Sequence, residues 1–190
     1  MNTRSDTRSK IQDVALELFG EQGYDKTSLR EIAERLGVTK AALYYHFKTK
    51  EEIVSSLFQA ADEGIQELIA WTKEREPTPE SRRELVRLYA RAMGDGRAFR
   101  LMRLIHENQH SLRELAAGMR GQERMESLAA FLTDPAAPLA AQLRARLSLG
   151  IMHFGMFALK DTDSTLDERL EAALQVAMDL IDASERDTVA

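Results

Sequence analysis

The sequence of 190 residues contains no cysteine. This absence excludes disulfides, thiolate metal sites and cysteine nucleophiles, and it is typical of a cytoplasmic protein. The sequence also lacks a run of 18 apolar residues, and its polar N-terminal segment has no signal-peptide core. From these absences we expect a cytoplasmic protein without a membrane span.

The signatures of several enzyme classes are missing too. There is no G-x-S-x-G sequence for a serine nucleophile, no phosphate-binding loop and no dinucleotide fingerprint. Strand-like alternation is lacking, whereas apolar residues at helical spacing recur along the whole chain. The sequence therefore predicts an all-α protein of about nine helices that is not an enzyme and needs no cofactor or metal.

Positive charge is scarce overall and unevenly distributed. The chain has 26 Lys and Arg against 31 Asp and Glu, a net charge of −5. Residues 1–50 carry 9 Lys and Arg against 7 Asp and Glu, and residues 51–190 carry 17 against 24. Because the local field governs attraction to phosphates, the division favours a nucleic-acid partner for the N-terminal part. We interpret Arg4, Arg8 and Lys10 as a frayed terminus rather than an arm over the minor groove.

Two short predicted helices joined by a glycine-containing turn are the most informative feature of the chain. The first covers residues 28–36 and opens with a capping box, Ser28 with Glu31. Gly37 ends it, and Thr39 is a good N-cap for the second short helix. Two short helices in this arrangement are typical of a helix-turn-helix DNA-binding domain.

Predicted helices on both sides support this pair. An amphipathic helix precedes it, with an apolar stripe from Ile11 to Phe19. A long helix follows, opened by a second capping box of Thr49 and Glu52. The residues that carry a family likeness are Ala15–Phe19, Gly23–Tyr24, Thr27–Ala33 and Gly37–Lys50.

On those residues the chain resembles the N-terminal domain of the tetracycline-repressor (TetR) family of bacterial transcription regulators, over roughly residues 8–58. The resemblance implies a helix-turn-helix DNA-binding domain in residues 1–50. It also implies a helical effector-binding and dimerisation domain in residues 51–190.

The second short helix and its surroundings provide the predicted DNA contacts. Lys40 can reach a guanine edge, and Ala41 can pack on a thymine methyl group. Tyr44 and His46 can donate to phosphates, and Lys50 adds its charge to a helix N-terminus. The resemblance favours five of them, namely Lys40, Tyr44, Tyr45, His46 and Lys50. The full predicted set is Thr27, Ser28, Arg30, Thr39, Lys40, Ala41, Tyr44, Tyr45, His46 and Lys50.

Several members of this set have another explanation. Thr27 and Ser28 offer hydroxyl and backbone donors to phosphate, and Arg30 can reach a base or a phosphate. Ser28 and Thr39 are explained equally well as helix caps. Tyr44 and Tyr45 are adjacent on one helix, so they cannot both face inward. We predict that Tyr45, rather than Tyr44, packs against the long helix.

The last two predicted helices, residues 139–158 and 166–181, have broad apolar faces. A short bundle cannot cover these faces from one side. A second copy of the chain would cover these faces, and the resulting two-fold dimer would recognise a palindrome. The resemblance implies the same dimer. The alternative is that both helices complete the core of one chain. The predicted interface residues are Leu143, Leu147, Ile151, Phe154, Leu170, Leu174, Ala177, Met178 and Ile181.

The resemblance also implies a pocket for a small-molecule effector between the middle helices. Methionine adapts to varied apolar ligands, although Met and aromatic residues at helical spacing are also ordinary core. The candidate lining is Trp71, Tyr89, Met93, Phe99, Met102, His106, Met119, Met125, Met152, His153, Met156 and Phe157.

One motif favours a different class. His106, Glu107 and His110 match H-E-x-x-H, the signature of zinc peptidases, which requires an unbroken helix and a third ligand. Ser111 and Glu114 form a capping box, so we expect a new helix at Ser111 and a bend near His110. A metallopeptidase is therefore the weaker hypothesis, and a regulatory metal site at the two histidines stays open.

Together these patterns predict a ligand-responsive transcriptional regulator. We favour a repressor that binds a palindromic operator in double-stranded DNA as a homodimer and is released by a small molecule. A transcriptional activator and a module that only coats DNA remain alternatives.

Overall fold

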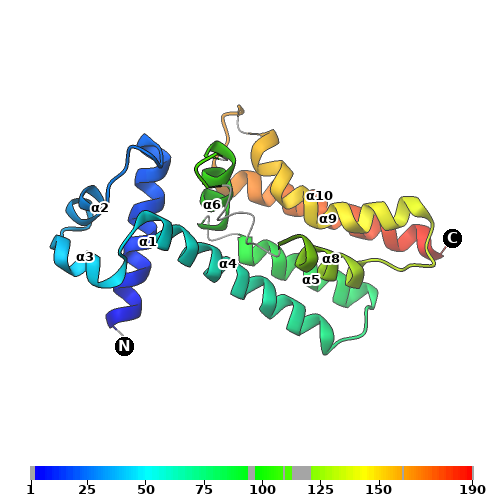
Figure 1. Ribbon diagram of the computed structural model, residues 1–190. Coiled ribbons are helices and arrows are strands. Elements are labelled where there is room, and N and C mark those ends of the chain that lie inside the picture. Colours follow the sequence, from blue (N-terminus) through cyan, green and yellow to red (C-terminus); the bar gives the residue numbers. More distant parts are fainter. Residues whose placement is uncertain (1–2, 94–96, 109, 113–120, 160, 190) are drawn as a thin grey trace. The chain divides into compact units, whose positions relative to one another are not determined.

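The computed structural model describes residues 3–93, 97–108, 110–112, 121–159 and 161–189. Every regular element in these ranges is an α-helix, which confirms the predicted all-α fold (Figure 1). The helices are α1 (Thr3–Gln22), α2 (Leu29–Leu36), α3 (Lys40–His46), α4 (Lys50–Lys73), α5 (Pro79–Met93), α6 (Arg97–Glu107), α8 (Gly121–Leu132), α9 (Leu139–Ala158) and α10 (Leu166–Val189). None of them is long and apolar enough to cross a membrane.

Side-chain caps fix the starts of two helices, and the first of them, α2, starts where the sequence predicts it. The Ser28 hydroxyl accepts a hydrogen bond from the Glu31 N–H, and the Glu31 carboxylate accepts one from the Ser28 N–H. Thr165 and Glu168 make the same reciprocal pair at the start of α10. These bonds satisfy N–H groups that have no partner inside the helix, so each box fixes a helix start.

The predicted box at the start of α4 forms only in part. Thr49 Oγ1 accepts from the Glu52 N–H at 3.1 Å, as a capping residue should. The Glu52 carboxylate, however, accepts from the Lys48 N–H at 2.6 Å, one residue before the expected donor. The helix still begins as predicted, because one of its first N–H groups is capped.

The chain divides into two compact units, each with its own core. The first unit comprises Met1–Ala61 with Arg100–Met119, and the second comprises Asp62–Phe99 with Arg120–Ala190. α4 contributes residues to both units. The boundary between a DNA-binding domain in residues 1–50 and a second domain in residues 51–190 remains a prediction.

The core of the first unit combines the first four helices with a segment distant in sequence. Leu43, Phe47 and Ile53 are almost completely buried there, together with Leu104 from α6 and Leu112 beyond it. α6 approaches α1 closely: a methyl group at Gly20 would come within 2.6 Å of the Arg103 guanidinium. The helices that the sequence predicts around the helix-turn-helix do not include this α6 contribution.

The core of the second unit lies between α5, α8, α9 and α10, with apolar residues of α4 packed against it. α9 and α10 run side by side, antiparallel to one another (Figure 1). An ion pair joins α5 to α10: Arg82 Nη1 lies 2.8 Å from Glu185 Oε1, with both side chains nearly buried. The helix predicted to begin at Ser111 and run past Met119 lies largely outside the described residues.

Candidate nucleic-acid interface

The turn between α2 and α3 depends on one glycine. Gly37 has φ +72°, in the left-handed region that glycine enters without strain. The Gly37 N–H donates to the Glu34 carbonyl at 3.1 Å, and the Val38 N–H donates to the Ala33 carbonyl at 3.0 Å. The last carbonyls of α2 are thereby satisfied, and the chain turns at once into α3.

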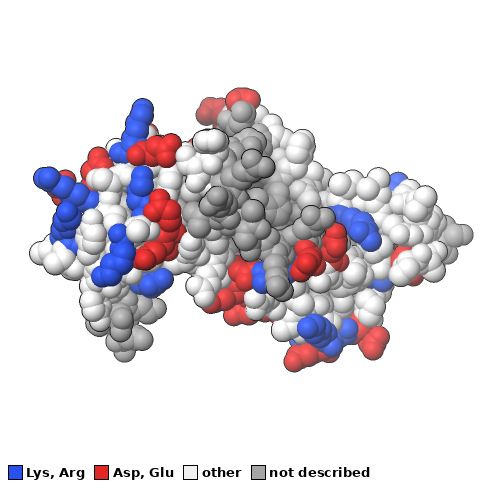
Figure 2. Space-filling view, viewed as in Figure 1, with Lys and Arg blue, Asp and Glu red and all other residues white. Residues whose placement is uncertain are grey.

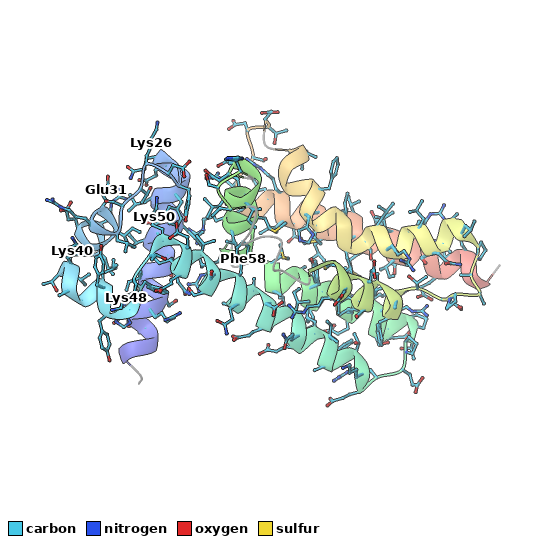
Figure 3. The ribbon with its side chains drawn as sticks, in the orientation of Figure 1. Lys26, Glu31, Lys40, Lys48, Lys50 and Phe58 are labelled. Carbon is cyan, nitrogen blue, oxygen red and sulfur yellow. The ribbon has the colours of Figure 1, made fainter. Side chains whose placement is uncertain are left out.

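α3 is oriented by two buried side chains. Leu43 and Phe47 are 0% and 1% exposed and lie in the core of the first unit. Thr39 caps the helix by accepting from the Ala42 N–H at 3.1 Å. The opposite face of its first turn, from Thr39 to Ala42, is exposed. Lys40, at the start of α3, therefore lies on the surface, as Figure 3 shows.

The prediction that Tyr45 packs inward is wrong. Tyr45 is 63% exposed, and Tyr44 is the half-buried tyrosine packed against the core of the first unit. The register of α3 explains this: Tyr45 lies about 200° around the helix from the buried Leu43, and Tyr44 only about 100°. Tyr45 consequently has the position expected of a DNA contact.

Lys40 is positioned by its helical neighbour. Its ammonium lies 5.3 Å from the centre of the Tyr44 ring, a cation–π contact one turn along α3. Among the described residues the ion pairs do not include Lys40. Its charge thus remains available for a guanine edge or a phosphate.

Thr27 does not have the role predicted for it. The residue is 2% exposed, and its hydroxyl donates to the Gly23 carbonyl at 2.8 Å. Its N–H donates to the Tyr24 carbonyl at 3.3 Å, so neither donor is open to phosphate in this structure. The Thr27 hydroxyl therefore stabilises the turn between α1 and α2 from inside the protein.

Ser28 acts as the N-cap that the sequence allows. Its hydroxyl and N–H both donate to Glu31 Oε2, and these hydrogen bonds lower the pKa of the Glu31 carboxyl. Arg30, one turn before Glu34, pairs with its carboxylate at 2.7 Å, and both side chains are exposed. An exposed pair of this kind separates at little cost, so Arg30 stays a predicted contact.

Lys50 lies in the first turn of α4, as predicted, but it is engaged within the protein. Its ammonium donates to the Tyr24 carbonyl at 2.6 Å and lies 4.5 Å from the centre of the Tyr24 ring. The Tyr24 hydroxyl donates to Glu51 Oε1 at 2.8 Å. Burial, and then this carboxylate, raise the pKa of the Tyr24 hydroxyl above its ordinary value. Lys50 therefore ties the turn after α1 to the start of α4.

His46 and Arg8 lie beside a cavity of about 360 Å³ between α1, α3 and α4. The Arg8 guanidinium lies 4.3 Å from the centre of the Phe47 ring. Lys10 pairs with Asp6 at 2.9 Å one turn away. The interpretation of Arg8 and Lys10 as a frayed terminus is wrong, since helix α1 already begins at Thr3.

Lys26 is a basic residue that the sequence interpretation missed. It is exposed and lies three residues before the start of α2 (Figure 3). A lysine two residues before a predicted N-cap is the signal that would have identified it. In Figure 2 the Lys and Arg side chains of this unit gather over α2 and α3, interspersed with acidic ones.

The predicted effector-pocket residues belong to different surroundings. Tyr89 and Met93 are buried in the core of the second unit, and Trp71 packs edge-on against Phe131 at 5.9 Å between ring centroids. Met102 is 37% exposed on α6, in the first unit. Met119 and the side chains of Phe99, His106, Met156 and Phe157 lie outside the described residues.

A polar contact lies within the core of the second unit. The Tyr89 hydroxyl lies 3.2 Å from His153 Nε2 and 3.5 Å from the Met125 sulfur. Burial lowers the pKa of the His153 imidazole below its usual 6.5, so the ring is neutral at pH 7. Three predicted pocket residues are therefore brought together, with two polar groups facing one another.

A groove of about 320 Å³ lies between α5, α9 and α10. Of the predicted pocket residues only Met152 lines it. Four charged residues that line it were not predicted from the sequence, namely Arg87, Arg91, Asp167 and Glu171. The other lining residues are Ala90, Met152, Leu170 and Leu174.

The peptidase motif lacks the helix it needs. α6 ends at Glu107, and His110 lies in a turn, so the two histidines do not share one continuous helix. The predicted bend near His110 is confirmed. Within the described ranges, no group of three His, Asp or Glu side chains is placed to hold a metal ion.

The predicted dimer residues fall into two groups. On α9, Leu143, Leu147 and Phe154 are exposed. On α10, Ala177 and Ile181 are 0% exposed, so their assignment to a dimer interface is wrong. Both belong to the core of the second unit within the same chain. The remaining four are half-buried against this core: Ile151, Leu170, Leu174 and Met178.

The geometry of α2, the turn and α3 defines a helix-turn-helix module. Residues 11–57 match the family model described as bacterial regulatory proteins, tetR family. The chain is 48% identical over 63 residues to the HTH-type transcriptional regulator AcrR of Shigella flexneri, covering 33% of this chain and 29% of that protein. It is 50% identical over 46 residues to the biofilm operon icaADBC negative transcriptional regulator IcaR of Staphylococcus epidermidis, covering 24% and 25%.

The likeness to solved structures extends over most of the chain. A transcriptional regulator of the TetR/AcrR family from Thermobifida fusca has a TM-score of 0.56 and 26% identity, covering 91% of this chain and 97% of that one. The family model therefore shows a TetR-type DNA-binding domain for residues 11–57, about a quarter of the chain. The sequence matches span less than a third of AcrR and IcaR.

Proposed function

We propose that this protein is a ligand-responsive transcriptional repressor that binds a palindromic operator as a homodimer. The observation that carries the proposal is the orientation of α3. Leu43 and Phe47 anchor it in the core, and Thr39–Ala42 are exposed on the side away from the core. A short helix presented in this way fits the major groove with its N-terminal residues against the bases. Repression is favoured over activation because IcaR is a negative regulator.

Dimerisation is part of the proposal. One α3 contacts only a few base pairs, whereas two related by a two-fold axis read half-sites about 34 Å apart. The exposed apolar residues of α9 offer a surface that a second chain can cover.

Release by a small molecule completes the proposed cycle. A ligand that binds better to a dimer with the wrong spacing between its two α3 helices shifts the population away from DNA. α4 is the proposed lever, because one continuous helix contributes to both units. We place the protein in the cytoplasm, where the chromosome of a bacterium is accessible to it, and assign it no enzymatic activity.

Selection of binding sites from random and genomic duplex DNA tests this function. We expect an enriched palindrome, and a reporter gene placed behind it should be silenced by the protein. If no palindrome is enriched, the protein is unfolded, freed of bound small molecules and refolded, and the selection is repeated. A second selection without enrichment would contradict operator binding. A reporter that is switched on instead would contradict repression and favour an activator.

A further inference from the structure

An apolar stripe runs along one face of α9 and is not covered within the described part of the chain. Leu139, Leu143, Leu147 and Phe154 are 83%, 57%, 48% and 65% exposed. They follow one another at spacings of four and seven residues, so they lie on one side of the helix. Val176 on the adjacent α10 is 43% exposed. In Figure 2 the surface over α9 is mostly uncharged.

The charges of α9 and α10 restrict what can cover this stripe. α9 contains two arginines and no acidic residue, whereas α10 contains seven acidic residues and two arginines. A second copy that placed α9 on α9 would bring arginines together, and α10 on α10 would bring carboxylates together. A second copy with α9 on the partner's α10 brings opposite charges together at both contacts.

The two arginines of α9 have different surroundings. Arg144 pairs with Asp187 of the same chain, on the α10 side of the helix. Arg146 lies about 200° further round, is exposed, and has no acidic residue three or four positions away. Asp179 on α10 is likewise exposed and has no basic residue at those positions. In the described residues neither Arg146 nor Asp179 has an ion-pair partner.

Arg146 and Asp179 lie at the same level of the helix pair. The Ser184 hydroxyl donates to the Ala141 carbonyl at 2.9 Å, and a methyl group at Gly155 would come within 3.0 Å of Ala173 Cβ. Interpolation between these two contacts places Arg146 level with about residue 180, less than one turn from Asp179. The two residues flank the stripe on opposite sides, since each lies on the side of its helix away from the other helix.

A two-fold axis parallel to α9 and α10 preserves this level and exchanges the two sides. It therefore brings Arg146 beside the partner's Asp179, twice in each dimer by symmetry. We propose that a second copy of this chain covers the stripe in this arrangement, and that Arg146 and the partner's Asp179 form the ion pair that selects it. This inference rests on the homodimer of the proposed function and adds the residues that make pairing specific.

Charge reversal tests the pair in the full-length protein. R146E and D179R each place like charges together at both contacts, so we expect each variant to dissociate about tenfold more readily in sedimentation equilibrium. An equimolar mixture of the two variants restores opposite charges at both contacts. We therefore expect heterodimers in the mixture, detected through a tag on one chain, and recovery in the double variant R146E/D179R.

The controls separate this inference from the dimer itself. Lys73, exposed near the end of α4, allows a matched change, and K73E should dimerise as the parent protein does. The difference between variants should shrink at 0.5 M NaCl because salt screens rim charges. If the parent dimerises and both reversals dimerise equally well, or the mixture forms no heterodimer, the ion pair is wrong. A parent protein that stays monomeric at all concentrations overturns the homodimer of the proposed function as well.

Discussion

Single residues of the interface differ in what they already contact inside the protein. Thr27 and Ser28 donate to neighbouring protein groups, and Lys50 donates to the Tyr24 carbonyl. Such residues shape the surface, because moving them to DNA requires that an existing bond be broken. Lys40 and Tyr45 extend from α3 into solvent, so sequence-specific affinity should depend on them most.

Lys40→Ala should weaken binding to the selected operator by about 1–3 kcal/mol and relax preference at one base pair of each half-site, because a base-edge contact is lost. Quantitative binding to operators with single substitutions measures both effects. Lys73→Ala removes the same charge from the second unit and should leave both values unchanged. Unaltered preference in the Lys40 variant would show that this residue contacts no base.

The two tyrosines of α3 should separate stability from binding. Tyr44→Ala removes a half-buried ring from the core and should lower the free energy of unfolding by about 1–2 kcal/mol. Tyr45→Ala should leave the midpoint of thermal unfolding almost unchanged and weaken DNA binding. Calorimetry and a binding titration on the same two proteins give the result. Equal destabilisation by both changes would contradict the observed register.

The buried imidazole of His153 makes stability depend on pH. Its pKa lies below 6.5 in the folded state, so near pH 6 the unfolded chain binds more protons than the folded one. The corresponding stability is present above pH 6.5 and is lost as the pH falls. Between pH 7.5 and 5.5 the parent protein should lose more thermal stability than His153→Gln, which cannot titrate but keeps a polar group near Tyr89.

Among the helices and turns, two glycines in the structure have opposite requirements. Gly37 needs its positive φ to end α2, whereas Gly64 lies inside α4, and nothing would contact a methyl group at either position. Gly37→Ala should lower the free energy of unfolding by about 1–2 kcal/mol because of backbone strain alone. Gly64→Ala should raise it by about 0.5–1 kcal/mol, since alanine favours the helix. Chemical denaturation of both variants measures this difference in sign.

The sequence predicts these elements well because their signals are local. Capping residues, Gly37 and the stripes of α2 and α3 act within a few positions, and the helix starts follow from them. The packing of α10 was not predictable in the same way. Its apolar residues surround more than half the helix, so periodicity cannot separate the side facing α9 from the side facing solvent. Thr27 and Tyr45 were misplaced for a related reason: their surroundings depend on the turn and register.

On the scale of the whole molecule, net charge and function oppose each other. The chain carries −5 overall, and under the proposed function its first unit must attract phosphates despite the acidic remainder. The proposed dimer offsets this acidity by binding two half-sites at once, which multiplies a modest affinity for each half-site.

Phe154→Glu places a charge on the exposed stripe of α9 and should convert the protein to a monomer. We expect loss of tight operator binding, with affinity for an isolated half-site unchanged, because α3 lies in the other unit. Binding titrations on full palindromes and on half-sites measure the two affinities. Tight operator binding by a protein that stays monomeric would contradict the dimeric mode of recognition.

The first unit is assembled from segments far apart in the chain, and this has a consequence for its synthesis. Residues 1–61 leave the ribosome well before Leu101, Leu104 and Leu112, which belong to the same core. Until those leucines emerge, part of the apolar surface of the nascent domain stays uncovered, as in other folds that depend on distant contacts. The first unit therefore completes its core only after more than half of the protein has been translated. A fragment ending after α4 should expose that surface and bind chaperones or aggregate.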